Sequence, residues 1–109
     1  MKDTRRELII AICEQGYSEM VMDAARECGA GGGTIIHAKG TGMQSAEKFL
    51  GITLASEKDV VLIVAKTAGK AEIMQAVMKK AGVETDAKAI CFSLPVTDTA
   101  GLRLYDEEE

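Results

Sequence analysis

The chain has 109 residues, of which 47% are hydrophobic and 28% charged, and its formal net charge is −4 with a pI near 5.0. Domains cluster near ~100–150 residues, so we expect residues 1–109 to form one domain. A single Pro and 11 Gly exclude a collagen-like or proline-rich disordered chain. The acidic balance argues against a nucleic-acid partner, because a phosphate backbone rewards clustered Lys and Arg.

The sequence shows neither a membrane-spanning segment nor an export signal. The longest apolar run near the start is Leu8–Cys13, far below the ~20 residues needed to cross a bilayer, and no small-residue cleavage site follows it. The three Cys residues are widely spaced, which fits neither a disulfide framework nor a zinc site. We therefore expect a cytoplasmic protein without a bound metal and without direct membrane insertion.

In chain order, the first element is a β-rich run, Leu8–Cys13, which predicts a strand with both faces buried. A helix follows, with Ser18 as its expected N-cap and Gly29 as the left-handed residue that ends it. Thr34–Lys39 predicts a second strand, and residues 40–51 a Gly-containing loop. The expected buried stripe of this first helix is Met20, Val21, Ala24, Ala25 and Cys28.

The same order then recurs. Asp59–Ala65 predicts a third strand, Gly69 opens and Gly82 closes a second helix, and Lys88–Leu94 predicts a fourth strand ended by Pro95. The expected stripe of the second helix is Ile73, Met74, Val77, Met78 and Ala81.

An internal repeat underlies this recurrence, because the two halves align at a constant offset of 53 residues, as from Gly16 to Gly69 and from Gly29 to Gly82. Two β-α-β halves predict an α+β fold of the ferredoxin-like βαββαβ kind. In that fold a four-stranded antiparallel sheet carries two helices on one face.

The first and third strands are apolar on both faces, yet two helices cover only one face of such a sheet. On the first strand Leu8, Ile10 and Ile12 point away from Ile9, Ala11 and Cys13. A bare apolar face exceeds what soluble monomers tolerate, so we expect a homo-oligomer. The alternative is that Val96–Tyr105 folds back over the face.

The clearest candidate site is the Lys39–Gln44 loop, in which Gly40 and Gly42 would take positive φ and present backbone N–H groups to an anion. A hinge for a mobile loop is an equally good interpretation. The loop lacks the Gly-Lys-Ser/Thr of a Walker A motif and the third Gly of a Rossmann turn. The glycine-rich run from Gly29 to Gly33 follows a helix and predicts a turn.

Catalytic and metal-binding patterns are not evident. His37 is the only histidine and has no obvious second ligand or nucleophile nearby in sequence. Cys13 and Cys91 are expected to be neighbours on adjacent strands, as small core residues, and Met20, Met22, Met74 and Met78 are expected to fill the core. We therefore expect a protein that is not an enzyme. Neither the CxxC of a heavy-metal-binding domain nor the Arg-bearing loop of an acylphosphatase is present.

The stretch Gly33–Gln44 (GTIIHAKGTGMQ) resembles the PII signalling protein family, the nitrogen-regulatory proteins and their PII-like relatives. It matches without gaps the family's Thr on the second strand and its Lys-Gly-x-Gly-Arg-Gln entry to the long T-loop. Lys88–Phe92 is similar to the family's Gly-Lys-Ile-Phe strand, and Leu94–Leu102 also resembles PII-like relatives. The resemblance covers nearly the whole chain.

The resemblance implies a homotrimer with an adenine nucleotide (AMP, ADP or ATP) as effector in each cleft between subunits, and no tightly bound cofactor. It also implies a shortened T-loop at residues 40–51 and a C-terminal segment at 96–109 that ends in an acidic tail. Through the T-loop, the family controls a partner such as a membrane transporter or a metabolic enzyme. The residues that carry over to nucleotide binding are Thr34, Gly40, Gly42, Met43, Gln44, Lys88 and Arg103.

Three departures from the family bear on the ligand. Met43 replaces the family's phosphate-binding Arg, and Glu84 and Asp86 stand in the loop before the last strand, where they repel a phosphate. A mono- or diphosphate, or another anion, therefore fits as well as a triphosphate. The T-loop contains no Tyr, so uridylylation on tyrosine is not expected. The alternative function is that of the trimeric CutA metal-tolerance proteins.

Overall fold

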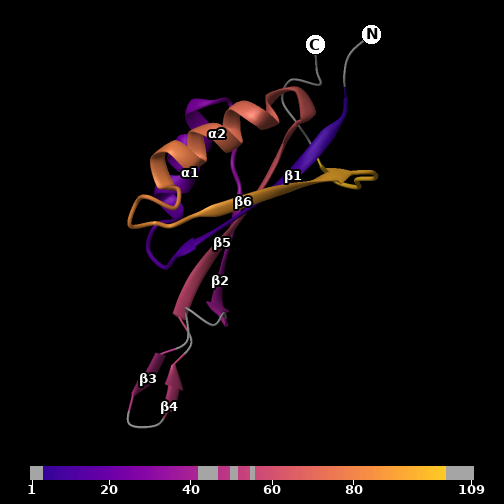
Figure 1. Cartoon of the computed structure of the whole chain (residues 1–109). Helices are drawn as coiled ribbons and strands as arrows, with labels where there is room; N and C mark the ends of the chain where they lie inside the picture. Colours follow the sequence, from indigo (N-terminus) through magenta and orange to yellow (C-terminus); the bar gives the residue numbers. More distant parts are fainter. Residues whose placement is uncertain (1–3, 42–46, 50–51, 55, 103–109) are drawn as a thin grey trace.

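The computed structural model describes residues 4–41, 47–49, 52–54 and 56–102. Two helices lie on one face of a four-stranded antiparallel sheet, and a small hairpin lies beyond one end of it (Figure 1). The elements are β1 (Arg6–Glu14), α1 (Ser18–Glu27), β2 (Thr34–Gly40), β3 (Glu47–Phe49), β4 (Ile52–Leu54), β5 (Ser56–Lys66), α2 (Lys70–Ala81) and β6 (Ile90–Val96), with a 3₁₀ turn at Thr67–Gly69 before α2. The strand order β2-β5-β1-β6 confirms the predicted βαββαβ arrangement.

The core lies between the sheet and the helices. Alternate residues of the two central strands point into it, and on β1 these are Ile9, Ala11 and Cys13, each at most 1% exposed. The helices contribute the faces predicted from periodicity, since Val21, Ala24 and Ala25 of α1 are fully buried. The second helix and β5 add Val61, Ile63, Ala65, Ile73, Val77 and Ala81 to this layer. Met22 belongs to the core, whereas Met78 is 37% exposed and does not fill it as expected.

The opposite face of the sheet has no helix over it. The register places the residues that alternate with the core positions in rows across all four strands, as in the row Thr34, Leu62, Ile10 and Phe92. The described part of the chain, which reaches Leu102, leaves Ile90, Phe92 and Leu94 between 44% and 50% exposed. We call the following set the open face: Leu8, Ile10, Ile12, Thr34, Ile36, Val60, Leu62, Val64, Ile90, Phe92 and Leu94. Ten of these eleven side chains are apolar.

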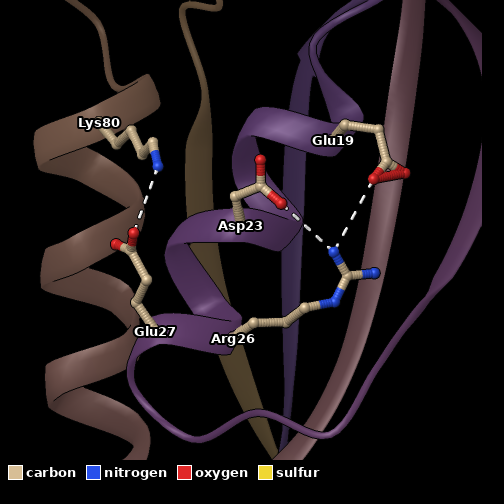
Figure 2. A network of polar contacts seen from close by, with 5 residues as sticks. All are labelled: Glu19, Asp23, Arg26, Glu27 and Lys80. Carbon is tan, nitrogen blue, oxygen red and sulfur yellow. Dashed lines mark hydrogen bonds and ion pairs between the residues drawn. The ribbon is translucent and has the colours of Figure 1, made fainter.

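The outer surfaces of the helices are polar. Arg26 lies 3.8 Å from Glu19 and 3.3 Å from Asp23 on the same helix, and Lys80 of α2 reaches Glu27 of α1 at 3.6 Å (Figure 2). All five side chains are largely exposed, so each pair adds at most about 1 kcal/mol to stability. The network marks this side as the solvent face, in contrast to the open face.

Glycine ends α1 as predicted. Gly29 has φ +98°, and its N–H bonds to the carbonyl of Arg26. Gly82 caps α2 for a different reason, since its φ is −76° and a Cβ there would lie 2.2 Å from the carbonyl oxygen of Met78. Ser18 is the first residue of α1 rather than its N-cap, which is Tyr17, and its side chain bonds to Asp59 of β5 instead of capping the helix.

Two further local expectations are wrong. Within residues 40–51, a loop in the prediction, β3 begins, and it pairs with β4. β6 starts at Ile90 and runs through Pro95 to Val96 instead of ending before the proline. Because β6 is an edge strand with β1 as its only partner in the described sheet, a residue without an N–H is accommodated there.

Candidate functional site

Four strand ends meet at one end of the sheet. Antiparallel pairing brings the last residue of β2, Gly40, beside the first residue of β5, Ser56, while the last residue of β1, Glu14, pairs with Lys58. β6 begins at this end as well, since Ile90 pairs with Ile12. We call this the loop end of the sheet. Hairpin β3–β4 projects from it, away from the helices (Figure 1). Two of the predicted site residues, Gly40 and Lys88, therefore lie at the same end of the fold.

Gly40 does not take the positive φ that the sequence suggested. It is a regular strand residue, and a Cβ there would lie 2.8 Å from Cε of Lys58 and 3.0 Å from Oγ of Ser56. The side chain of Lys58 crosses Gly40 and forms an ion pair with Glu14 on β1. A side chain at position 40 would displace that lysine, so the glycine serves close packing at the exit of β2.

Lys88 has φ +49°, the one non-glycine residue with positive φ in the described part of the chain. Its neighbours Ala87 and Ala89 are both fully buried, and the N–H of Ala89 bonds to the carbonyl of Ala81 at 2.7 Å. The N–H of Lys88 itself bonds to Thr85. Surrounding contacts thus hold a lysine in a conformation that costs about 1–2 kcal/mol for a residue with a Cβ. The result is an exposed lysine fixed at the loop end.

Two acids accompany Lys88 in its loop. Glu84 and Asp86 are exposed, whereas Thr85 between them bonds back to the carbonyl of Gly82 through both its N–H and its hydroxyl. The Lys88 loop, residues 82–89, is therefore a tightly hydrogen-bonded connection that presents one cation and two anions. An anion bound here would be attracted by Lys88 and repelled by Glu84 and Asp86, as the sequence indicated.

Thr34 lies at the far end of β2 from Gly40, and it pairs with Leu62 near the middle of β5. The two are six residue steps apart along the strand, about 20 Å at the usual rise. One chain therefore does not bring Thr34 and Gly40 to a common ligand. Gly42, Met43, Gln44 and Arg103, the other predicted contacts, lie outside the described residues.

A buried carboxylate, missed in the sequence, lies just behind the loop end. Asp59 of β5 is 2% exposed and accepts hydrogen bonds from Nδ1 of His37 at 2.7 Å and from the N–H of Gly16 at 3.1 Å. The hydrogen bond from His37 lowers the pKa of Asp59, burial opposes this, and the bonds from Gly16 and Ser18 lower it further. Asp59 is thus an ionised anchor between β2 and the turn that leads into α1.

The signal for this contact was present in the sequence. Asp59 alternates in register with Val61 and Ile63, which places it on the helix-covered face despite its charge. His37, which seemed to lack a partner, lies directly across from it on β2.

The three cysteines lie in the core or pack against it. All three are free, and Cys91 lies directly opposite Ala11, which makes Cys13 its diagonal neighbour on the adjacent strand. Burial, and then the charge of Asp59, raise the pKa of the Cys13 thiol, so it stays protonated. Among the described side chains, no group of three or more His, Cys, Asp or Glu is arranged to hold a metal ion.

No helix within the described ranges is long and apolar enough to span a membrane.

Comparisons with known proteins agree with this architecture. The family model for nitrogen regulatory protein P-II matches residues 6–106. No curated protein sequence matches the chain. B. subtilis GlnK is similar in structure, with a TM-score of 0.69 at 13% identity over 88% of this chain and 89% of that one.

Two further structures are similar to this chain. The B. subtilis GlnK–ATP complex has a TM-score of 0.67 at 12% identity, covering 87% of this chain and 86% of that one. A PII-like signalling protein from Thermus thermophilus has a TM-score of 0.64 at 15% identity, covering 84% and 86%. These TM-scores establish the fold, and the family match spans almost the whole chain. The chain belongs to the P-II family of nitrogen regulatory proteins.

Proposed function

We propose that the protein is a PII-type sensor whose effector is an adenine nucleotide, bound in clefts between the subunits of a homotrimer. The observation that carries the proposal is Lys88, an exposed cation held in a strained conformation at the same end of the sheet as the exit of β2. Strain that the surroundings maintain is typical of ligand sites. The similar fold of a GlnK bound to ATP supports the choice of nucleotide.

The dimensions of the site favour an elongated ligand. Between β2, which ends at Gly40, and β6, which follows Lys88, lie two other strands, so the two segments are three strand spacings apart, about 14 Å. A ligand that contacts both has to bridge the width of the sheet end. A nucleotide, with a base at one end and phosphates at the other, suits this better than a small ion.

The open face supports the oligomer. Its apolar side chains form rows across four strands, and those of β6 are about half exposed in the single chain. Burial against identical copies removes this surface from water and is favourable by about 25 cal/mol per Å². The separation of Thr34 from Gly40 also suits a trimer, because Thr34 would then contribute to the site of a neighbouring copy.

A bound nucleotide would regulate a partner through residues 40–51. A nucleotide bound at the loop end would bias the conformation of residues 40–51 and so change their fit to a partner, a membrane transporter or a metabolic enzyme. The alternative of a CutA-like metal-binding protein has no supporting observation among the described residues.

Isothermal titration with AMP, ADP and ATP tests the nucleotide, on protein whose trimeric mass has been established by light scattering. We expect binding that Lys88→Ala weakens about tenfold or more, because a charge-assisted contact contributes about 1.5–3 kcal/mol. The matched control is Lys79→Ala, which removes an exposed lysine from the last turn of α2. Absence of heat with all three nucleotides in a verified trimer would refute the nucleotide proposal.

Removing the two acidic side chains of the Lys88 loop tests how many phosphates of the nucleotide lie near this loop. The double variant Glu84→Gln, Asp86→Asn removes two negative charges beside Lys88, so we expect ATP affinity to rise more than AMP affinity. An equal change for both nucleotides would mean that the phosphates lie away from this loop.

A further inference from the structure

The two segments of the proposed nucleotide site are joined through one short turn. Residues 14–16 leave β1 and lead toward α1, and we call them the Glu14–Gly16 turn. On one side, the N–H of Gly16 donates to the carboxylate of Asp59 at 3.1 Å. On the other side, the N–H of Glu14 donates to the carbonyl of Ala87 at 2.9 Å, and Ala87 directly precedes Lys88.

Asp59 completes the connection to β2. Its second oxygen accepts Nδ1–H of His37 at 2.7 Å, and His37 is three residues from Gly40, where β2 ends. β2 is an edge strand that pairs with β5 alone in the described sheet, and most of its residues are exposed. A hydrogen bond to a buried, ionised carboxylate is therefore an important side-chain anchor for the half of β2 nearest its exit.

The buried charge of Asp59 strengthens this anchor. A carboxylate that is 2% exposed has to keep its donors, because losing one leaves a buried oxygen without compensation. His37 and the Glu14–Gly16 turn are thus held at fixed positions on one side chain. These hydrogen bonds, together with the backbone of the turn, form a continuous path from His37 on β2 to Ala87, which precedes Lys88.

We infer that Asp59 is a positioning residue that couples the exit of β2 to the Lys88 loop through the Glu14–Gly16 turn. The role in ligand binding rests on the proposed function, whereas the mechanical coupling does not. A nucleotide held at Lys88 would change the conformational preference of β2 at its exit. By thermodynamic reciprocity, a partner that holds residues 40–51 would change nucleotide affinity by the same factor.

The first experiment measures coupling without any ligand. Asp59→Asn keeps the shape of the side chain but removes the charge and one acceptor. We expect amide hydrogen exchange, read by NMR, to accelerate at Gly16 and also at Glu14, whose N–H bonds to Ala87 rather than to Asp59. Exchange that accelerates at Gly16 alone would overturn the coupling.

Glu7→Gln is the matched control. It removes a carboxylate from β1, the strand that ends at Glu14, but from the ion pair with Lys70 at the opposite end of the sheet. We expect it to leave the exchange rates of Glu14 and Gly16 at wild-type values. Equal acceleration in both variants would show general loss of stability instead of coupling.

The second experiment measures coupling to the ligand by a double-mutant cycle of Asp59→Asn and Lys88→Ala, read as ATP affinity. We expect the two effects to deviate from additivity at least fivefold, because the side chains act on one coupled unit without touching each other. Additivity within twofold would overturn the inference. If the wild-type trimer binds no nucleotide, the proposed function fails, and the exchange experiment still decides the coupling.

Discussion

Substitution of Gly33 tests how closely the start of β2 packs against β5 and α1. It precedes β2, and a Cβ at this position would lie 2.8 Å from the carbonyl oxygen of Leu62, 2.9 Å from Sδ of Met22 and 3.2 Å from Cγ1 of Ile63. The Leu62 carbonyl belongs to the backbone of a central strand, and Met22 is buried in the core, so neither yields easily. We expect Gly33→Ala to lower the free energy of unfolding by about 1–3 kcal/mol.

Thermal unfolding followed by circular dichroism measures this effect. For a chain of this size each kcal/mol corresponds to roughly 4 °C, so Tm should fall by about 4–12 °C. Gly32→Ala is the matched control, since no atom lies within 4 Å of its Cβ position and its φ is not positive. It should raise stability by up to about 1 kcal/mol, through lower entropy of the unfolded chain. Both variants are compared at one protein concentration, because an oligomer's Tm depends on it. Equal Tm values for the two variants would refute the close approach at Gly33.

Three further predictions concern the open face, the Lys88 loop and the buried carboxylate. Leu62→Glu places a charge in the middle of the open face and should give a monomer by analytical ultracentrifugation, whereas Met78→Glu on α2 should leave the oligomer intact; dissociation by both would contradict the assignment of the interface. Lys88→Gly should raise the free energy of unfolding by urea by up to about 1 kcal/mol, because glycine tolerates φ +49° at little steric cost, while a decrease would mean that the lysine is unstrained. Above about pH 4, the wild-type protein should be more stable than Asp59→Asn by about 1–3 kcal/mol. This difference should shrink at lower pH, because the pKa of Asp59 is lowered in the folded state. A difference that persists unchanged at pH 2 would refute this.

The regular elements were predictable because their signals are local. Apolar runs such as Leu8–Cys13, the periodic stripe of α1 and the helix-ending Gly29 each depend on residues within a few positions of one another. The repeat of 53 residues then led to the strand order, since few topologies join two β-α-β halves without crossed connections. The uncovered sheet face followed from counting helices against apolar strand faces.

The contacts at the loop end were not predictable in this way. The sequence around Gly40 predicts a flexible loop glycine. Only the contact with the side chain of Lys58, 18 residues later, shows that Gly40 is a packed strand residue. Pro95 predicts the end of a strand, but the structure places it within the edge strand β6. Each of these roles is set by a residue distant in the chain.

The sequence by itself determined the class of fold, the positions of its main strands and helices, the apolar face that lacks a helix, and the resemblance to the P-II family. These features rest on periodicity and on short motifs, which depend on nearest neighbours along the chain. Only the tertiary structure decided that Lys88 is held in a strained conformation and that Asp59 joins His37 to Gly16. Strand register brings such residues together across 22 and 43 positions of sequence, and the burial that gives them their energetic weight exists only once the sheet has formed.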